Sequence, residues 1–368
     1  MLTDAVRPSY SGPGLSTLVP SLFAVPVADW LPAPVHEARS VVLLVLDGLG
    51  WDAIDTRRAQ LPALAALEGG PVPTVVPSTT ATALTSLTTG LPPSQHGVMG
   101  FRIRIDGAVL NILSWQGESK HPPDPRTVQR HAPFLHREVP VVTASEFRGS
   151  SFSEVHYGSA PFHGWHTTSA LVEHCRRLVG AGERLVYAYY PGVDKIAHAH
   201  GLHDGFYEAE LVATDRLVAD VRDALPQSCA LVVTADHGQV HMDADSWLPL
   251  DALDELIDGY AGDARFRYLH ARRGAANELL AAARSEHGER AWVFSRDELF
   301  DDGWLGPAPT PHARARVGDV VLAARADVGF IDPAIPFERR LRSAHGSLTA
   351  AEMLVPVLAG RGTGGSPG

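Results

Sequence analysis

The feature that most constrains this chain is an uninterrupted apolar run that ends in an acid. The segment that begins at Ser40, SVVLLVLDGLG, is rich in valine and leucine and ends at Asp47. Such runs are typical of strands buried on both faces of a parallel sheet. Two later segments, ERLVYAYYPGVD and CALVVTADHG, repeat the pattern. Because ligands bind at the carboxyl ends of the strands in open α/β sheets, we expect the three segments to deliver acids to one edge.

The length and charge of the chain limit the classes of function. Its 368 residues, 45% of them hydrophobic, can form one large α/β domain, with or without an insertion. The net charge of −11 predicts no basic surface for a long nucleic acid. A small anionic substrate would therefore need local positive charge, such as bound metal ions.

Cysteine usage and the distribution of apolar residues predict the subcellular location of the protein. Cys175 and Cys229 show neither metal-ligand spacing nor the spacing of a redox pair, which fits a reduced cytoplasm. The first forty residues lack the pattern of an export signal, and no apolar run approaches the roughly 18 residues of a membrane span. We therefore expect a cytoplasmic protein that does not bind membranes.

The remaining segments indicate helices and a small insertion. YEAELVATDRLVADVRDAL has apolar residues at helical spacing. TTATALTSLTT reads as a helix that ends at Gly90. After His241 the pattern changes to short alternating strands and helices. We therefore predict one domain, residues 1–368, with a small α+β insertion at about 262–335. Residues that determine specificity are expected between Gly100 and Gly182 or in this insertion.

Several acids and histidines have spacings that suit metal ions. In PGVDKIAHAHG, Asp194 and His198 are four residues apart, so a helix there would place both side chains on one face. In TADHGQ, Asp236 and His237 follow directly on a strand. Each pattern is common in proteins without metal, where it forms a turn or a solvated loop.

Joint occurrence is the stronger argument for a metal site. His345, in RSAHGSLTAAEM, has by itself the ordinary interpretation of a histidine bonded to loop backbone. Together, three aspartates and three histidines at strand ends or in loops make two mixed N/O ligand sets suited to Zn²⁺ or Mn²⁺. The six candidate ligands are Asp47, Asp194, His198, Asp236, His237 and His345.

A hydroxyl near the start of a helix is the candidate nucleophile. Thr79 and Thr80 fall in the first turn of the helix that Gly90 ends, where free N–H groups and the helix dipole favour phosphate. Two metal ions beside Thr80 could bind both the nucleophile and a phosphoryl oxygen. The alternative is that these hydroxyls, or that of Ser78, cap the helix.

The ordered motifs resemble the alkaline phosphatase superfamily, in its type I phosphodiesterase/nucleotide pyrophosphatase branch. They are VLLVLDGLG, PSTTATALTSLTTGLPPSQHG, YPGVDKIAHAHG, TADHGQ and SAHG. The resemblance implies a sandwich of a mostly parallel sheet with helices on both faces. It implies that the nucleophile lies ten residues before Gly90, at Thr80, with Thr79 as the fallback. It further implies one metal held by Asp194, His198 and His345, and another held by Asp47, Asp236 and His237 and bridged by Thr80.

Two departures from the family pattern bear on the substrate. The aromatic residue and the asparagine that usually follow the nucleophile are replaced by Ala81 and Ala83, which we expect to leave open space beside it. The PSTTATALTSL variant resembles an actinobacterial group that includes cyclic di-AMP phosphodiesterases. The resemblance therefore implies a small nucleotide phosphodiester substrate, such as cyclic di-AMP or its linear dinucleotide product.

Two other functions stay open on the sequence. A phosphomonoesterase or phosphomutase would use the same residues and an additional cation for a dianionic phosphate, for which Lys195, Arg102 and Arg104 are candidates. An inactive metal-binding nucleotide sensor would keep the ligands without turnover. The presence of all six expected ligands argues against the sensor.

Overall fold

A seven-stranded sheet forms the centre of the computed structural model, which describes residues 4–364. Neighbouring strands pair in parallel except at β18, which runs antiparallel to both β2 and β9. The predicted α/β fold with a mostly parallel sheet is therefore confirmed. In spatial order the strands are β2 (Glu68–Pro73), β18 (Leu354–Arg361), β9 (Cys229–Thr234), β1 (Ser40–Leu46), β8 (Leu185–Tyr190), β6 (Val141–Ala144) and β7 (Phe162–Trp165).

The three apolar runs of the sequence are the three central strands. Every residue of β9, and every residue of β1 after Ser40, is buried, as expected for strands covered on both faces. In the parallel register Val45 lies between Tyr189 and Thr234. The chain therefore leaves all three strands at the same edge of the sheet.

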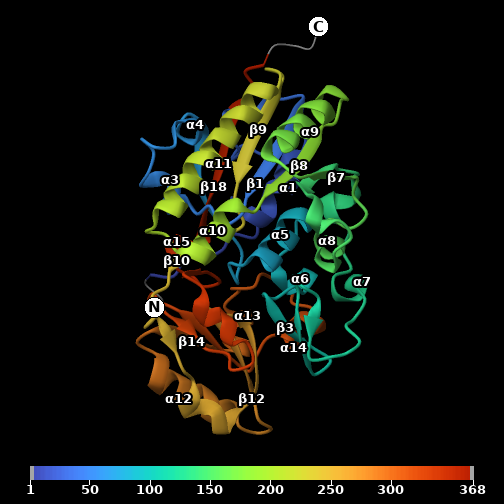
Figure 1. Ribbon diagram of the computed structural model, residues 1–368. Coiled ribbons are helices and arrows are strands. Elements are labelled where there is room, and N and C mark those ends of the chain that lie inside the picture. The colour runs from blue at the N-terminus through green and yellow to red at the C-terminus, as the bar shows by residue number, and fades with distance from the viewer. Residues whose placement is uncertain (1–3, 365–368) are drawn as a thin grey trace.

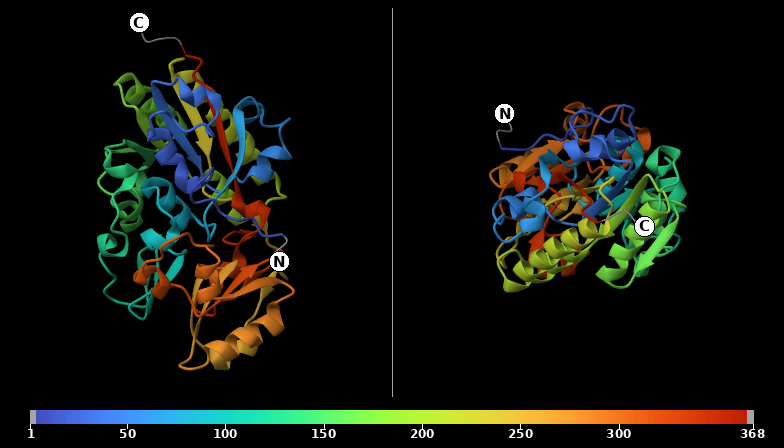
Figure 2. Two further views of the ribbon diagram at one scale, coloured as in Figure 1. Left: turned by 180° about the vertical axis from the view of Figure 1, so that it is seen from behind. Right: turned by 90° about the horizontal axis from the view of Figure 1, so that it is seen from above.

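Helices cover both faces of this sheet. α9 (Thr168–Gly180) and α11 (Gly205–Ala224) lie on one face (Figure 1), and α1 (Leu15–Phe23) and α2 (Ala33–His36) lie on the other (Figure 2, left). The apolar spacing that predicted α11 is confirmed, because Leu211, Val218 and Val221 are among its buried residues. The sandwich expected from the family resemblance is thus present.

Two further helices begin at the carboxyl edge. α10 (Gly192–His200) follows β8. α5 (Thr80–Thr89) is buried along its whole length and ends at Gly90, whose φ of 71° is left-handed, as predicted. The hydroxyls of Thr85, Thr88 and Thr89 donate back to helix carbonyls, for example Thr85 to Ala81 at 2.7 Å, which satisfies these buried donors.

A second, antiparallel sheet lies beyond the carboxyl edge of the first (Figure 1). Its order is β12 (Ile257–Asp263), β13 (Phe266–Ala271), β15 (Val320–Ala324) and β14 (Ala291–Ser295). It begins a few residues before the predicted insertion boundary of 262, and the division into a domain and an insertion stays a prediction. α12 (Ala276–His287), α13 (Arg296–Asp301) and α14 (Pro311–Arg316) belong to the same stretch of chain.

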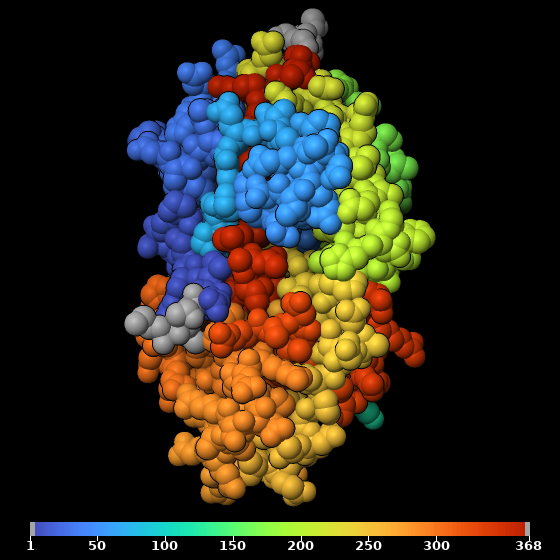
Figure 3. All heavy atoms as spheres, turned by 90° about the vertical axis from the view of Figure 1, so that its left-hand side faces the viewer, coloured from blue at the N-terminus to red at the C-terminus, as the bar shows by residue number. Residues whose placement is uncertain are grey.

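A buried ion pair joins the two sheets. Arg265, between β12 and β13, donates to both carboxylate oxygens of Glu352 at 2.8 Å, and both side chains are fully buried. Glu352 belongs to α15 (Ala350–Met353), which leads into β18 of the large sheet. On the face shown in Figure 3, the orange part of the chain, which contains α12 and β14, packs directly against dark-blue residues from the start of the chain and red residues that precede β18.

The remaining elements are short. Within residues 4–364, none of the helices combines the length and apolarity needed to cross a lipid bilayer. The short elements are α3 (Trp51–Asp55), α4 (Pro62–Ala65), α6 (Pro93–His96), β3 (Arg102–Ile105), β4 (Ala108–Asn111), β5 (Gln116–Gly117), α7 (Pro125–Val128), η1 (Pro133–His136), η2 (Ser145–Phe147), α8 (Ser151–His156), β10 (Val240–His241), β11 (Trp247–Leu248), η3 (Asp251–Leu256), β16 (Gly329–Phe330), η4 (Pro336–Arg340) and β17 (Ser343–Ala344).

Candidate metal centre and nucleophile

The first predicted ligand group lies where β1 and β9 end. Asp47 directly follows β1, and Asp236 and His237 follow β9, so the parallel register brings them together. One ligand atom from each of the three lies within 4.8 Å of the others. All three side chains are buried.

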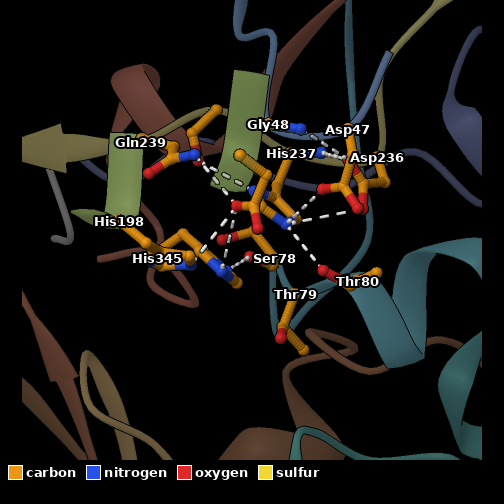
Figure 4. A network of polar contacts seen from close by, with 12 residues as sticks. Asp47, Gly48, Ser78, Thr79, Thr80, His198, Asp236, His237, Gln239 and His345 are labelled. Carbon is orange, nitrogen blue, oxygen red and sulfur yellow. Dashed lines mark hydrogen bonds and ion pairs between the residues drawn. The ribbon is translucent and has the colours of Figure 1, made fainter. Parts of the chain in front are cut away.

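Each of the two carboxylates has one occupied oxygen and one free oxygen. Asp236 Oδ1 accepts from the N–H groups of Gly48 at 3.0 Å and His237 at 3.1 Å, and Asp47 Oδ2 accepts from the Tyr189 hydroxyl. Asp47 Oδ1 and Asp236 Oδ2 are buried and have no hydrogen-bond partner in the described chain. These free oxygens face His237, at 3.6 and 3.4 Å from its Nε2 (Figure 4).

The free oxygens make this group suited to a cation. Burial, and then the charges of Asp236 and Asp194, raise the pKa of Asp47 well above its usual range. A buried carboxylate oxygen without a partner is costly, and a divalent ion would remove that cost. Two ligand atoms on one tetrahedral Zn²⁺ are roughly 3.4 Å apart, which is close to the observed separations.

The second group combines α10 with the segment after β17. Asp194 and His198 lie one helical turn apart on α10, as their spacing predicted, with Asp194 Oδ1 3.3 Å from His198 Nε2. His345 Nε2 lies 3.9 Å from the same oxygen. These side chains are partly exposed, so this group is the one that solvent or substrate can reach.

All three histidines are oriented by backbone carbonyls. The Nδ1 atoms of His198, His237 and His345 lie 2.9, 3.0 and 3.1 Å from the carbonyl oxygens of Ser343, Gly238 and Ser78. A carbonyl can only accept, so Nδ1 carries the proton and Nε2 is left with a free lone pair. This arrangement is typical of metal-binding histidines.

The two groups adjoin each other through a pair of stacked rings. The imidazoles of His237 and His345 have centroids 3.6 Å apart and planes 15° apart. Burial, and then the charges of His237 and His198, lower the pKa of His345 well below its usual range. The ring therefore stays neutral at physiological pH, which a nitrogen ligand requires.

Thr79 and Thr80 point in different directions. The Thr80 hydroxyl lies 3.1 Å from His237 Nε2, whereas Thr79 is directed away from the histidines (Figure 4). The Thr79 hydroxyl donates to Asp263 Oδ1 at 2.7 Å. Thr79 is also the N-cap residue of α5, but its side chain accepts no capping hydrogen bond. The predicted nucleophile Thr80 is thus the hydroxyl that adjoins the candidate metal groups.

Several residues that support the site were not identified from the sequence. Gln239 donates to Asp194 at 2.9 Å, and Tyr189 donates to Asp47. Gln239 stands in the TADHGQ motif, which was a usable signal, whereas Tyr189 is one apolar-strand residue among several. Gly48 has a φ of 74°, and a Cβ there would come within 2.5 Å of Gln239 Nε2, so a glycine is required.

A pocket of about 230 Å³ opens onto Thr80 and the second ligand group. Residues from the stretch after Gly100 contribute to it, as do Asp263 and Ala264, which belong to the predicted insertion. Its lining comprises Thr79, Thr80, Phe101, Leu113, Asp194, His198, Asp263, Ala264, Phe337, Glu338, Leu341, Ala344 and His345.

Two expectations about the surroundings of the nucleophile are wrong. Ala81 and Ala83 are fully buried in α5 and do not line the pocket, so they create no open space beside Thr80. The three candidate cations also lie outside the pocket, because each is engaged by an acid elsewhere. Lys195 pairs with Glu146 at 2.7 Å, Arg104 pairs with Asp258 at 2.8 Å, and Arg102 pairs with Asp332.

Sequence comparison assigns the protein to a class. The family described as type I phosphodiesterase / nucleotide pyrophosphatase matches residues 41–348. The chain therefore belongs to this family of hydrolases, within the alkaline phosphatase superfamily, whose members typically use two metal ions. No curated protein matches the chain by sequence.

Two kinds of enzyme are among the solved structures that share this fold. Murine ectonucleotide pyrophosphatase / phosphodiesterase 5 superposes with a TM-score of 0.66 at 16% identity, covering 89% of this chain and 90% of that one. Another structure of the murine protein is of an inactive threonine-to-alanine variant in complex with AMP. Phosphonoacetate hydrolase from Sinorhizobium meliloti, in complex with phosphonoformate, has a TM-score of 0.63 at 18% identity, covering 89% and 91%.

Proposed function

We propose that this protein is a metal-dependent phosphodiesterase that cleaves a nucleotide phosphodiester through a phosphothreonine at Thr80. The ions would be two divalent cations, Zn²⁺ or Mn²⁺, one held by Asp47, Asp236 and His237 and the other by the group that contains His345. The single observation that carries the choice of a diester is the charge of the pocket. Among residues 4–364, no lysine or arginine lines the pocket at Thr80.

The charge of the substrate follows from that lining. A phosphodiester carries one negative charge at phosphorus, which two divalent ions can match, whereas a dianionic monoester needs further cationic donors. The pocket offers acids instead: burial raises the pKa of Asp263 to about 6 and that of Glu338 to about 7. Neither side chain can donate a cationic hydrogen bond to a second phosphate charge.

The apolar side of the pocket supports a nucleotide as the group beyond the phosphate. Phe337 is 49% exposed and Leu113 is 38% exposed, although both are large and apolar. Both line the pocket at Thr80, together with Phe101 and Leu341. Exposed aromatic faces bind nucleobases by stacking, at about 1–3 kcal/mol per base. These residues would supply the stacking surface for a base that the family's usual aromatic residue provides and that Ala81 cannot.

The finer proposal concerns the nucleotide itself. We propose an adenine dinucleotide, either cyclic di-AMP or its linear product, as the substrate. It is supported by the motif resemblance and by the AMP bound to the murine relative. Such a dinucleotide offers one negative charge at each phosphodiester phosphorus, as other diesters do.

The chain's own residues suggest how the reaction proceeds. The Thr80 hydroxyl gives up its proton as its oxygen attacks phosphorus, and the leaving-group oxygen departs with the electron pair of its P–O bond and takes up a proton. Water later breaks the bond between Thr80 and phosphorus, which releases the nucleotide and restores the hydroxyl. The first N–H groups of α5 have no partner within the helix and can bind phosphoryl oxygens. Bound ions would add positive charge that favours the Thr80 alkoxide and the departing oxygen.

An assay with paired substrates tests the proposal. Purified protein with Mn²⁺ or Zn²⁺ is given bis(p-nitrophenyl) phosphate and p-nitrophenyl phosphate, and we expect faster turnover of the diester. Faster turnover of the monoester would instead support the phosphomonoesterase, and no turnover of any substrate would support the sensor. Chromatography of products from cyclic di-AMP, linear di-adenylate and AMP then tests the finer proposal, which dominant release of phosphate from AMP would contradict.

A further inference from the structure

A second pocket, of about 470 Å³, shares no lining residue with the pocket at Thr80. Its lining residues come from the β3–β4 hairpin, α7, α14 and the second sheet; β3 and α14 lie side by side in Figure 1. Basic side chains dominate its polar lining, although the net charge of the chain is −11. They are Arg104, Arg130, Arg296, Arg316, His270 and His312.

Arg316 is a buried guanidinium that forms no ion pair within residues 4–364. It is 7% exposed, and its Nη1 donates to the carbonyl oxygens of Gly97 at 2.6 Å and Val128 at 2.9 Å. Among the described residues, Arg102, Arg265 and Arg267 are at least as buried as Arg316, and each pairs with a carboxylate. Within residues 4–364 Arg316 has no such ion pair, and burying a charge without a directly paired counter-charge is costly.

The neighbours of Arg316 increase the need for an anion. Burial, and then the charge of Arg130, lower the pKa of Arg316 to about 10, although the nearby carboxylate of Asp106 acts in the opposite direction. The two acids in the lining are Asp106 and Asp319, and Asp319 is engaged by Arg296 at 2.7 Å. The exposed Arg130 has no carboxylate partner in the described chain.

A buried histidine in the same pocket also lacks a partner. His270, on β13, is 4% exposed, and its Nε2 has no hydrogen-bond partner among residues 4–364. Burial, and then the charge of Arg104, lower the pKa of His270 to about 4, so the ring is neutral at physiological pH. A neutral imidazole can still donate one N–H to an oxygen of a ligand.

We propose that this pocket is a binding site for a phosphate-bearing anion, separate from the candidate metal centre. Arg316 and Arg130 would bind the phosphate oxygens, since the planar guanidinium matches phosphate geometry. His270 would donate a further hydrogen bond. The site requires no metal ion, which distinguishes it from the pocket at Thr80.

Equilibrium dialysis of the metal-loaded full chain against labelled orthophosphate tests this site. We expect wild-type protein to bind an equivalent that persists after EDTA treatment, and Arg130→Ala to weaken it about tenfold or more, because a charge-assisted interaction is removed. Arg316→Met, which keeps the side-chain length, should do the same. Arg216→Ala is the matched control, since Arg216 is an exposed arginine on α11, paired with Asp220.

The outcomes are separable from those of the proposed function. Diester turnover by Arg130→Ala should stay within about twofold of wild type, because Arg130 does not line the pocket at Thr80. If Arg316→Met fails to fold, phosphate binding by Arg130→Ala still tests the proposal, because Arg130 is exposed. Complete loss of phosphate binding on EDTA treatment, or unchanged binding by Arg130→Ala, would overturn the proposal whether or not the protein cleaves diesters.

Discussion

His237 and His345 stack face to face, with ring centroids 3.6 Å apart, although they belong to different ligand groups and are far apart in sequence. The Nδ1 atom of each ring faces a backbone carbonyl. The two ligand groups therefore meet at this pair of stacked rings. Backbone carbonyls, rather than exposed side chains, fix the orientation of both rings. A change to either ring should disturb both groups.

The choice between the two threonines can be tested by single substitutions. Thr80→Ala should lower kcat for a diester by roughly three orders of magnitude or more, because it removes the nucleophile of a covalent route. Thr79→Ala removes a hydrogen bond to Asp263 and should keep much of the activity. Quench-flow detection of a phosphorylated protein, present in wild type and absent in Thr80→Ala, checks the role directly. The reverse ranking of the two variants would assign the reaction to Thr79.

Metal binding should be visible in stability as well as in turnover. Removing divalent ions with EDTA should lower the melting temperature of wild type, because Asp47 Oδ1 and Asp236 Oδ2 are then buried without partners. Asp236→Asn should abolish turnover, yet in EDTA it should unfold at the same or a higher temperature than wild type, since one of two neighbouring buried carboxylates is neutralised. His198→Ala should likewise abolish turnover with the fold intact. Wild-type activity of either variant at saturating metal would refute the ligand assignment.

Phe337 should contribute to binding of the nucleotide rather than to chemistry. Phe337→Ala should raise KM for a dinucleotide about tenfold and change kcat little, in line with the loss of one stacking contact. Phe206→Ala is the matched control, since Phe206 is 59% exposed and lies outside the pocket. Steady-state kinetics of the two variants with a dinucleotide and with a small dialkyl phosphate separate the effects. An equal loss on both substrates would contradict a role in base binding.

The ion pair between Arg265 and Glu352 should hold the two sheets together. Glu352→Gln leaves the fully buried guanidinium without its counter-charge and should lower the free energy of unfolding by about 3–5 kcal/mol. Asp220→Asn, which removes an exposed partner of Arg216, should have little effect. Urea denaturation followed by far-UV circular dichroism compares them. Equal midpoints for Glu352→Gln and wild type would show that the pair does not stabilise this packing.

Much of the fold, and the residues gathered at the site, could be predicted because their signals are local. An apolar run followed by an acid predicted β1 and the position of Asp47. The spacing of Asp194 and His198 predicted a common helix face, and Gly90 predicted the end of α5. Helical and strand periodicity depends on neighbouring residues, so the sequence by itself determined these elements and the edge at which the acids meet.

Tertiary structure alone decided the surroundings of those residues. The partner of Thr79 is Asp263, 184 positions away, and the aromatic surface beside Thr80 comes from Phe101 and Phe337 rather than from α5. The free oxygens of Asp47 and Asp236 likewise depend on which N–H and hydroxyl groups reach the other oxygen. The burial of Arg316 without an ion pair among the described residues cannot be predicted from the sequence either, because no local pattern distinguishes it from the other arginines. Contacts between distant segments, burial and the absence of a counter-charge are properties of packing, and no local pattern encodes them.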